Sequence, residues 1–286
     1  MASAHHFHVL LVHLSTLAFL LSEAPTATQA TTAMVKPGCA DRCGNLRIPY
    51  PFGITKDCYL DEAFLVTCNH SFNPPIAFLG TSNLNVTEIS LQGQLQLWQF
   101  VGYDCYDRKG KERSYSGATF ELAKFTISTE NKFTVIGCDT LAYMDFYQGE
   151  ELEKYSTTGC VSICDNLNSV ADGSCSGVGC CQTSIPKGVW SIDIQLSNYN
   201  NYTNVSGSNP CGYAFVAEQS EFKFTPTYLR KLQNTSMLPM VVDWAVGNET
   251  YNTKCYKPDN GYATSGYRCD CVEGYEGNPY LTNGCQ

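Results

Sequence analysis

Histidine chemistry has little support in this sequence. The 286 residues include five histidines, of which His5, His6, His8 and His13 lie near the N-terminus. A Ser-His-Asp or Cys-His nucleophile system elsewhere in the chain would depend on His70. That residue lies inside the glycosylation sequon Asn69-His70-Ser71, where a glycan would crowd a general base. We therefore assign no catalytic residue.

Paired carboxylates are the second chemistry to consider, because two of them can hydrolyse a glycosidic bond without histidine. Glu150, Glu151 and Glu153 form an acidic cluster followed by Lys154, a composition typical of a solvated loop. No residue order singles out a catalytic pair. A glycosidase remains an alternative, and release of reducing ends from a polysaccharide by the purified protein would support it.

The 16 cysteines offer a choice between metal ligation and disulfides. Close pairs such as Cys39 and Cys43, Cys160 and Cys164, or Cys175 and Cys180 superficially resemble zinc ligands. An even count of this size favours disulfides in an oxidising compartment, although spacing does not give the connectivity of the first twelve cysteines. We expect no metal and no cofactor.

The N-terminal residues predict how the chain would reach an oxidising compartment. Residues 9–21 form an apolar run of thirteen residues followed by small residues up to Ala30, which predicts a signal peptide over residues 1–30. The run is too short for a membrane span, which needs roughly 20 apolar residues, and no later segment is apolar for long enough. We expect a secreted, extracellular protein, attached to a membrane only if the leader is retained or if the chain is a fragment of a receptor.

Charge and sequons agree with this location. The formal net charge of −9 disfavours nucleic acid as a partner, because phosphate contacts need clustered Lys and Arg. Several surface glycans are expected from six Asn-x-Ser/Thr sequons, at least one of them unused. The sequons begin at Asn69, Asn85, Asn201, Asn204, Asn234 and Asn248.

The elements that must position any site are predicted to be strands. Apolar and polar residues alternate over residues 190–196 and 242–246, as in half-buried strands. Residues 89–91 and 95–97 flank Gln92-Gly93-Gln94 and predict a hairpin. Further strands are expected at residues 64–68, 120–128, 133–136 and 213–217, and one helix at 225–232. The fold class is all-β or β-dominated and disulfide-rich, with two small β-rich lobes followed by a truncated EGF-like hairpin.

Several runs of residues resemble the ectodomain of plant wall-associated receptor kinases. The resemblance covers nearly the whole chain after the leader. It is carried by Cys43-Gly44-Asn45-Leu46-Arg47-Ile48-Pro49-Tyr50-Pro51-Phe52-Gly53, Tyr103-Asp104-Cys105, Gly179-Cys180-Cys181, Asn209-Pro210-Cys211-Gly212-Tyr213, Val242-Asp243-Trp244, Gly266-Tyr267-Arg268-Cys269 and Gly277-Asn278-Pro279-Tyr280-Leu281.

This resemblance implies an organisation and a ligand. It implies a galacturonan-binding domain at residues 36–113, a β-rich cysteine-rich region at 114–250 and a partial EGF-like module at 254–286. In that module it implies the disulfides Cys271–Cys285 and Cys255–Cys269. The implied ligand is pectin, as homogalacturonan or oligogalacturonides, in the plant cell wall. The family's kinase motifs do not occur in this chain, so no kinase activity is expected of it.

An anionic polysaccharide requires cationic side chains, because each sugar carries one carboxylate. Residues 36–113 contain eight basic and eight acidic residues, so the excess of acid lies elsewhere in the chain. Within this segment we expect the ligand contacts from seven basic side chains. They are Arg42, Arg47, Lys56, Arg108, Lys109, Lys111 and Arg113.

Two other interpretations stay open. The chain could act as a soluble decoy or co-receptor that binds a receptor-kinase ectodomain, which pull-down from membranes rather than from wall extract would show. It could also be a fragment of a full-length wall-associated receptor kinase, which the genomic sequence after Gln286 would decide.

Overall fold

Two runs of mostly apolar residues, 213–217 and 133–136, bury both of their faces, as expected of central strands. The computed structural model describes residues 33–122, 124–149, 155–232, 235–246, 253–258 and 266–286. The runs lie in β16 (Cys211–Glu218) and β11 (Asn131–Gly137), which pair antiparallel. Alternate residues of β16 belong to two different hydrophobic cores, since Ala214 packs in one and Phe215 in the other.

These strands are the centre of a five-stranded sheet with the order β14-β11-β16-β7-β8. Its second core is closed by Leu229 and Leu232, which are fully buried in and just after the short helix α2 (Tyr228–Lys231). The remaining strands are β7 (Gly102–Tyr106), β8 (Glu112–Ser116) and β14 (Gly179–Ser184).

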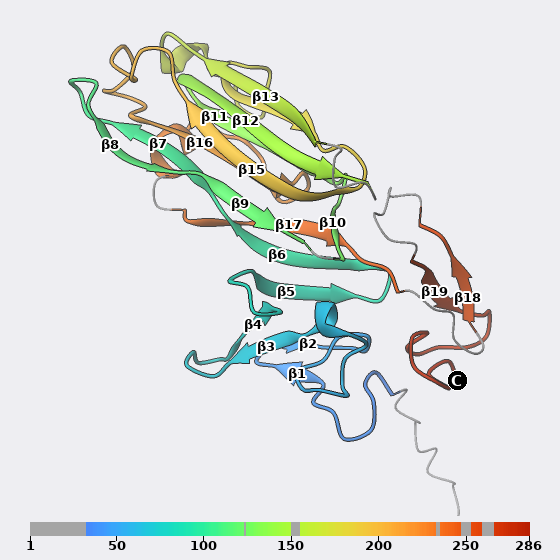
Figure 1. Cartoon of the computed structure of the whole chain (residues 1–286). Coiled ribbons are helices and arrows are strands. Elements are labelled where there is room, and N and C mark those ends of the chain that lie inside the picture. The colour runs from blue at the N-terminus through green and yellow to red at the C-terminus, as the bar shows by residue number, and fades with distance from the viewer. Residues whose placement is uncertain (1–32, 123, 150–154, 233–234, 247–252, 259–265) are drawn as a thin grey trace, which may run out of the picture. The chain divides into compact units, whose positions relative to one another are not determined.

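A four-stranded sheet, β13-β12-β15-β9, contributes Met144 and Ile194 to the first core, where they join Val135 and Ala214 of the five-stranded sheet (Figure 1). The alternation over residues 190–196 correctly predicted β15. The strands of this sheet are β9 (Ala118–Glu121), β12 (Asp139–Gln148), β13 (Tyr155–Ile163) and β15 (Val189–Ser197).

The third large sheet has six strands in the order β10-β17-β6-β5-β4-β3. The hairpin predicted around Gly93 is its β5–β6 pair, and Gly93 has φ +90°, a conformation that favours glycine. The strands are β3 (Val66–Asn69), β4 (Ile76–Leu79), β5 (Asn85–Ser90), β6 (Gln94–Phe100), β10 (Thr126–Ile127) and β17 (Met237–Asp243). The single-turn 3-10 helices η1 (Glu62–Phe64) and η2 (Leu167–Ser169) lie in the connections.

The described part of the chain is therefore strand-dominated and held by eight disulfides, which confirms the predicted fold class. No cysteine in it is free. The pairs are Cys39–Cys58, Cys43–Cys68, Cys105–Cys211, Cys138–Cys164, Cys160–Cys181, Cys175–Cys180, Cys255–Cys269 and Cys271–Cys285. In the described ranges no helix is long and apolar enough to cross a membrane.

Strands from residues 36–113 and from residues 114–250 are interleaved. β6 pairs with β17, and β7 pairs with β16, so two of the three large sheets draw on both segments. Residues Thr32–Gln286 form one compact unit. The site must therefore be sought across both segments rather than within residues 36–113 alone.

One predicted strand is two strands. Residues 120–128 were expected to be continuous, but β9 ends at Glu121 in the four-stranded sheet and β10 begins at Thr126 in the six-stranded sheet. The chain crosses between sheets because Phe125 enters an aromatic cluster with Phe52 and Phe64. The local pattern of apolar residues cannot predict this break, because the contacts that cause it are with residues distant in sequence.

The C-terminal tail is packed against the same cluster. It forms the hairpin of β18 (Thr253–Tyr256) and β19 (Arg268–Cys271), in which Cys255 lies opposite Cys269. Nδ2 of the buried Asn278 donates hydrogen bonds to the carbonyl oxygens of Met34 (2.9 Å) and Tyr50 (2.6 Å). The tail is thereby fixed to the N-terminal segment.

A buried carboxylate in β7 makes the stability sensitive to pH. Asp104 is 2% exposed and accepts a 2.9 Å hydrogen bond from Asn198 on Oδ2, while its Oδ1 has no partner in the described structure. Burial raises the pKa of the Asp104 carboxyl, only partly opposed by the Asn198 bond. A group whose pKa is raised by folding stabilises the protein at low pH, and that contribution is lost as the pH rises through the folded-state pKa.

The variant Asp104→Asn should therefore be more stable than the wild type at pH 7, by about 1 kcal/mol, because it removes the buried charge and keeps an acceptor for Asn198. The difference should shrink as the pH falls through the raised pKa of Asp104 and the carboxyl becomes protonated. Urea unfolding of both proteins at several pH values measures it. A difference that does not change with pH would show that the Asp104 charge is not its cause.

Candidate functional site

Arg42 and Arg47 lie directly opposite each other on a two-stranded ribbon, β1 (Arg42–Cys43) and β2 (Leu46–Arg47). Both arginines are exposed, whereas Cys43 and Leu46 point into the core. The turn between them needs Gly44, which has φ +56° and whose Cβ would overlap the carbonyl oxygen of Pro75. The sequence thus places two guanidinium groups side by side in solvent.

Lys56 occupies a different setting. It is exposed two residues before Cys58, whose disulfide to Cys39 closes this loop. It shares a shallow hollow with acidic residues, including Asp57 and Glu62. This mixture of charges makes Lys56 a weaker candidate for carboxylate binding than the two arginines.

The remaining four basic candidates lie in and beside the β7–β8 turn, which Asp107 organises. The backbone N–H groups of Lys109 and Lys111 donate to Asp107 Oδ1 at 2.8 and 3.1 Å. These bonds, those of Lys111 and Lys109 in that order, lower the pKa of the Asp107 carboxyl. Gly110 completes the turn at φ +75°. The turn is therefore well defined, and it exposes Arg108, Lys109, Lys111 and Arg113 to solvent.

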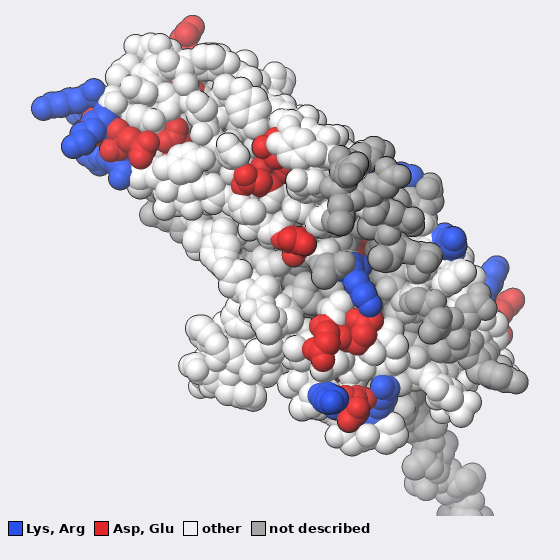
Figure 2. Space-filling model, in the orientation of Figure 1, with Lys and Arg blue, Asp and Glu red and all other residues white. Residues whose placement is uncertain are grey.

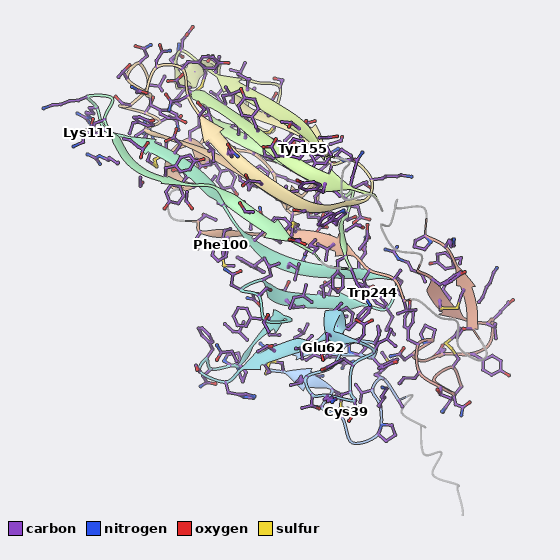
Figure 3. The ribbon with its side chains drawn as sticks, in the orientation of Figure 1. Cys39, Glu62, Phe100, Lys111, Tyr155 and Trp244 are labelled. Atoms are coloured by element: carbon purple, nitrogen blue, oxygen red, sulfur yellow. A yellow bond between two sulfur atoms is a disulfide. The ribbon has the colours of Figure 1, made fainter. Side chains whose placement is uncertain are left out.

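The structure does not bring all seven basic residues together. The cations of the β7–β8 turn gather at the upper left of Figure 2, away from the basic groups at the bottom of the view. Figure 3 places Lys111 of the turn and Cys39, which precedes β1, at opposite ends of the described chain. Two separate cationic groups result: the arginine pair (Arg42 and Arg47) and the basic turn (Arg108, Lys109, Lys111 and Arg113).

Neither cationic group forms an ion pair within the described residues, although the Asp107 carboxylate lies near Lys109 and Arg113. The ion pairs in the described ranges include Lys124–Asp61 and Arg268–Asp243, and none involves the side chains of these six residues. The four cations of the basic turn outnumber Asp107, so both groups can still attract an anionic ligand.

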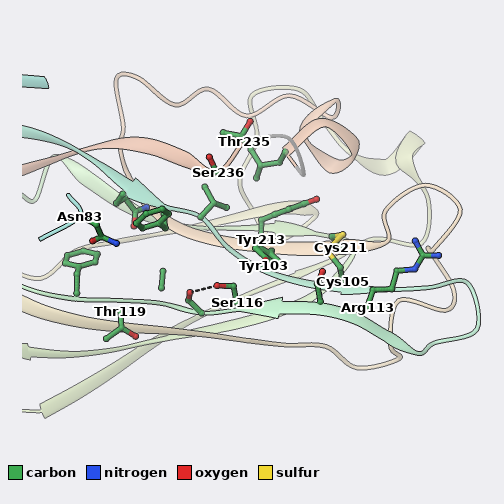
Figure 4. A pocket seen from close by; sticks show the side chains of 18 of the residues that line it. Asn83, Tyr103, Cys105, Arg113, Ser116, Thr119, Cys211, Tyr213, Thr235 and Ser236 are labelled. Carbon is green, nitrogen blue, oxygen red and sulfur yellow. Dashed lines mark hydrogen bonds between the residues drawn. A yellow bond between two sulfur atoms is a disulfide. The ribbon is translucent and has the colours of Figure 1, made fainter. Parts of the chain in front are cut away.

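A groove of about 760 Å³, which we call the β7–β8 groove, begins beside Arg113. Its walls come from the end of β6, from β7, β8 and β9, and from the segment before β17 (Figure 4). Phe100 and Tyr103 expose 42% and 36% of their surface there. Burial raises the pKa of Tyr213 to about 12, so its phenol remains a neutral hydrogen-bond donor at physiological pH.

No local sequence pattern indicates this groove, because its lining residues are spread from Asn83 to Ser236. Of the residues predicted to bind ligand, Arg113 alone lines it. A run of basic residues is visible in a sequence, whereas an aromatic groove assembled from five strands is not.

Four of the six sequons fall on described residues. Asn201 and Asn204 are exposed, while Asn69 and Asn85 are half-buried in β3 and β5. Asn234 and Asn248 lie outside the described residues. A Cβ on Gly110 would meet Asn201 and Thr203, so a glycan on Asn201 would lie beside the basic turn.

The disulfides implied for the tail are present, with Cα separations of 4.1 Å for Cys255–Cys269 and 5.5 Å for Cys271–Cys285. The second bridge closes the loop that contains Asn278 and Tyr280. A strand-rich chain with eight disulfides and two exposed cationic groups is typical of a secreted binding module.

Comparison with known proteins identifies the class. Residues 39–99 match the family model of the galacturonan-binding domain of wall-associated receptor kinases, and residues 172–254 match the wall-associated kinase model. The two matches cover the arginine pair and Cys211, but not the basic turn.

Curated relatives agree with these matches. The chain is 39% identical to wall-associated receptor kinase 2 of Arabidopsis thaliana, over 91% of its own length. It is 35% identical to wall-associated receptor kinase 5 and 34% identical to wall-associated receptor kinase 1 of the same plant. The alignment spans 36% of each of these three relatives. No solved structure gives a significant match. The chain is a wall-associated-kinase-like ectodomain.

Proposed function

We propose that this chain binds de-esterified homogalacturonan outside the cell, through exposed basic side chains, and that its role is recognition rather than catalysis. The observation that carries the proposal is the galacturonan-binding family match at residues 39–99, which contains the paired and exposed Arg42 and Arg47. Guanidinium groups bind carboxylates with charge-assisted, often bidentate hydrogen bonds.

A linear polyuronate presents a carboxylate on every sugar, so one polymer can contact more than one cationic group. The arginine pair and the basic turn are separate, and each is expected to contribute independently. Contacts between exposed charges weaken with salt, so the affinity should fall as ionic strength rises.

Variants of the two cationic groups test the proposal. We expect Arg42→Ser with Arg47→Ser, and separately Arg108→Ser, Lys109→Ser, Lys111→Ser and Arg113→Ser combined, each to weaken binding of polygalacturonate about tenfold or more, since charged hydrogen bonds contribute about 1.5–3 kcal/mol each. Lys254→Ser with Lys257→Ser, two exposed cations of the tail, is the matched control. Biolayer interferometry on N-deglycosylated protein measures the affinity.

Normal binding by both sets of variants, with circular dichroism unchanged, would exclude these side chains as the binding site. Loss of binding in one set only would assign the contact to that cationic group. An equal loss in the lysine control would indicate nonspecific attraction and contradict the proposal.

A further inference from the structure

The β7–β8 groove has the size of a small-ligand site. Its volume of about 760 Å³ lies within the range of roughly 300–1,000 Å³ that such sites occupy. Two partly exposed rings, Phe100 and Tyr103, lie on adjacent elements, at the end of β6 and in β7. Aromatic rings at this exposure offer apolar faces, against which the C–H faces of a sugar ring can pack.

Polar groups surround these rings. Asn83, Ser114 and Ser236 are exposed on the groove walls, and their side chains make no hydrogen bond within the described structure. Figure 4 shows Ser116 and Ser236 on facing walls, with Tyr103 and Tyr213 in the middle of the groove. Hydroxyl and amide groups can donate and accept hydrogen bonds, which matches the hydroxyl groups of a sugar.

A buried orphan acceptor lies at the same place. Gln99 is fully buried and lines the groove, and its Nε2 donates to the carbonyl oxygen of Val216 at 2.5 Å. Its Oε1 has no hydrogen-bond partner in the described structure. Native proteins rarely leave such an atom unpaired, and an exception calls for an explanation, such as an ordered water, an ion or a role at a functional site.

Charge along the groove is confined to one end. Among its described lining residues Arg113 is the single charged one, and Figure 4 places it at the opposite end from Asn83 and Thr119. One guanidinium can neutralise one carboxylate. Further carboxylates along the groove would be desolvated without a cationic partner, which is costly.

We infer that the β7–β8 groove binds a short galacturonide segment with one free carboxylate at Arg113 and with esterified or otherwise neutral sugar rings over Phe100 and Tyr103. This inference rests on the proposed function and adds a second binding site with a different ligand preference. The exposed cationic groups favour fully charged polymer, whereas the groove takes partly esterified chains.

The test uses three trisaccharides of galacturonic acid: the free acid, the full methyl ester, and the trisaccharide with one free carboxylate. Isothermal titration calorimetry of the full chain, after N-deglycosylation, gives the affinities. Deglycosylation is needed because Thr235 and Ser236 of the sequon at Asn234 line the groove. The singly charged trisaccharide should bind about tenfold more tightly than the full ester, because its carboxylate can pair with Arg113. The free acid reports in addition on the exposed cationic groups.

Two groove variants identify the site. Arg113→Gln should remove the tenfold preference for the singly charged trisaccharide over the full ester, while leaving the affinity for the ester unchanged. Phe100→Ala with Tyr103→Ala should weaken binding of both about tenfold. Phe72→Ala with Tyr275→Ala, two exposed rings elsewhere, is the matched control and should bind as the wild type does.

Groove variants that bind normally would overturn the inference, as would an Arg113→Gln protein that keeps the preference for the singly charged trisaccharide over the full ester. These results are distinguishable from failure of the proposed function, which is the absence of wild-type binding to polygalacturonate.

Discussion

Replacing Trp244 with alanine should lower the free energy of unfolding by about 3–5 kcal/mol, the largest loss we expect from a single substitution in this protein. Trp244 is fully buried, with ring centroids 5.4 Å from Phe52, 6.0 Å from Phe64 and 5.1 Å from Tyr280. Its Nε1 donates to the carbonyl oxygen of Gln94 at 3.1 Å. The indole therefore joins the N-terminal segment, the six-stranded sheet and the tail.

The substitution would leave a cavity at this junction and an unpaired carbonyl group. Trp98→Ala is the matched control. This tryptophan of β6 is 39% exposed, so its replacement should lower the free energy of unfolding by less. Urea unfolding followed by far-ultraviolet circular dichroism measures both variants. A Trp244→Ala protein as stable as the Trp98→Ala protein would show that the aromatic cluster does not hold these three parts together.

Removing the Cys105–Cys211 disulfide should cost about 4–5 kcal/mol, if the loss follows the entropy of the loop that the bridge closes. The two cysteines are 106 residues apart in sequence and lie opposite each other on β7 and β16. Without the bridge the conformational entropy of the unfolded chain rises, whereas the pairing of β7 with β16 in the folded state can remain. The free energy of unfolding therefore falls.

The Cys175–Cys180 bridge provides the comparison, because it spans only five residues and its removal should cost about 2 kcal/mol by the same argument. Each pair is replaced by alanine, and unfolding in urea gives the two losses. Equal losses would mean that native contacts around the bridges, rather than loop entropy, determine their contribution.

Most of the local secondary structure could be predicted from the sequence. Alternation over residues 190–196 predicted β15, the Gly93 turn predicted the β5–β6 hairpin, and the buried run 213–217 predicted β16. The predicted helix at 225–232 is present as the single turn α2 (Tyr228–Lys231). These elements depend on side-chain periodicity and turn chemistry, which act over a few residues.

The rest depends on contacts between distant residues. The strand predicted at 120–128 is interrupted because Phe125 packs against Phe52 and Phe64, which are about 70 and about 60 residues away in sequence. Cys105 pairs with Cys211 because the two residues lie opposite each other on β7 and β16. Neither fact can be obtained from spacing alone.

The candidate site was predictable in composition but not in arrangement. Arg42, Arg47 and the basic turn occur within one segment of the sequence, yet the fold places them in two separate groups. The β7–β8 groove was missed because residues of five strands form it, and of these only Arg113 had been predicted to bind ligand.

We have proposed that this ectodomain recognises galacturonan through attraction between its exposed basic side chains and the carboxylates of the polymer. The most direct test of this claim is calorimetric titration of the N-deglycosylated chain with de-esterified oligogalacturonide and with a neutral galactan oligosaccharide of equal length, at low and high salt. We predict binding of the oligogalacturonide that weakens as salt rises, and much weaker binding of the galactan. Equal binding of both sugars, or no binding of the oligogalacturonide at low salt, would contradict the claim.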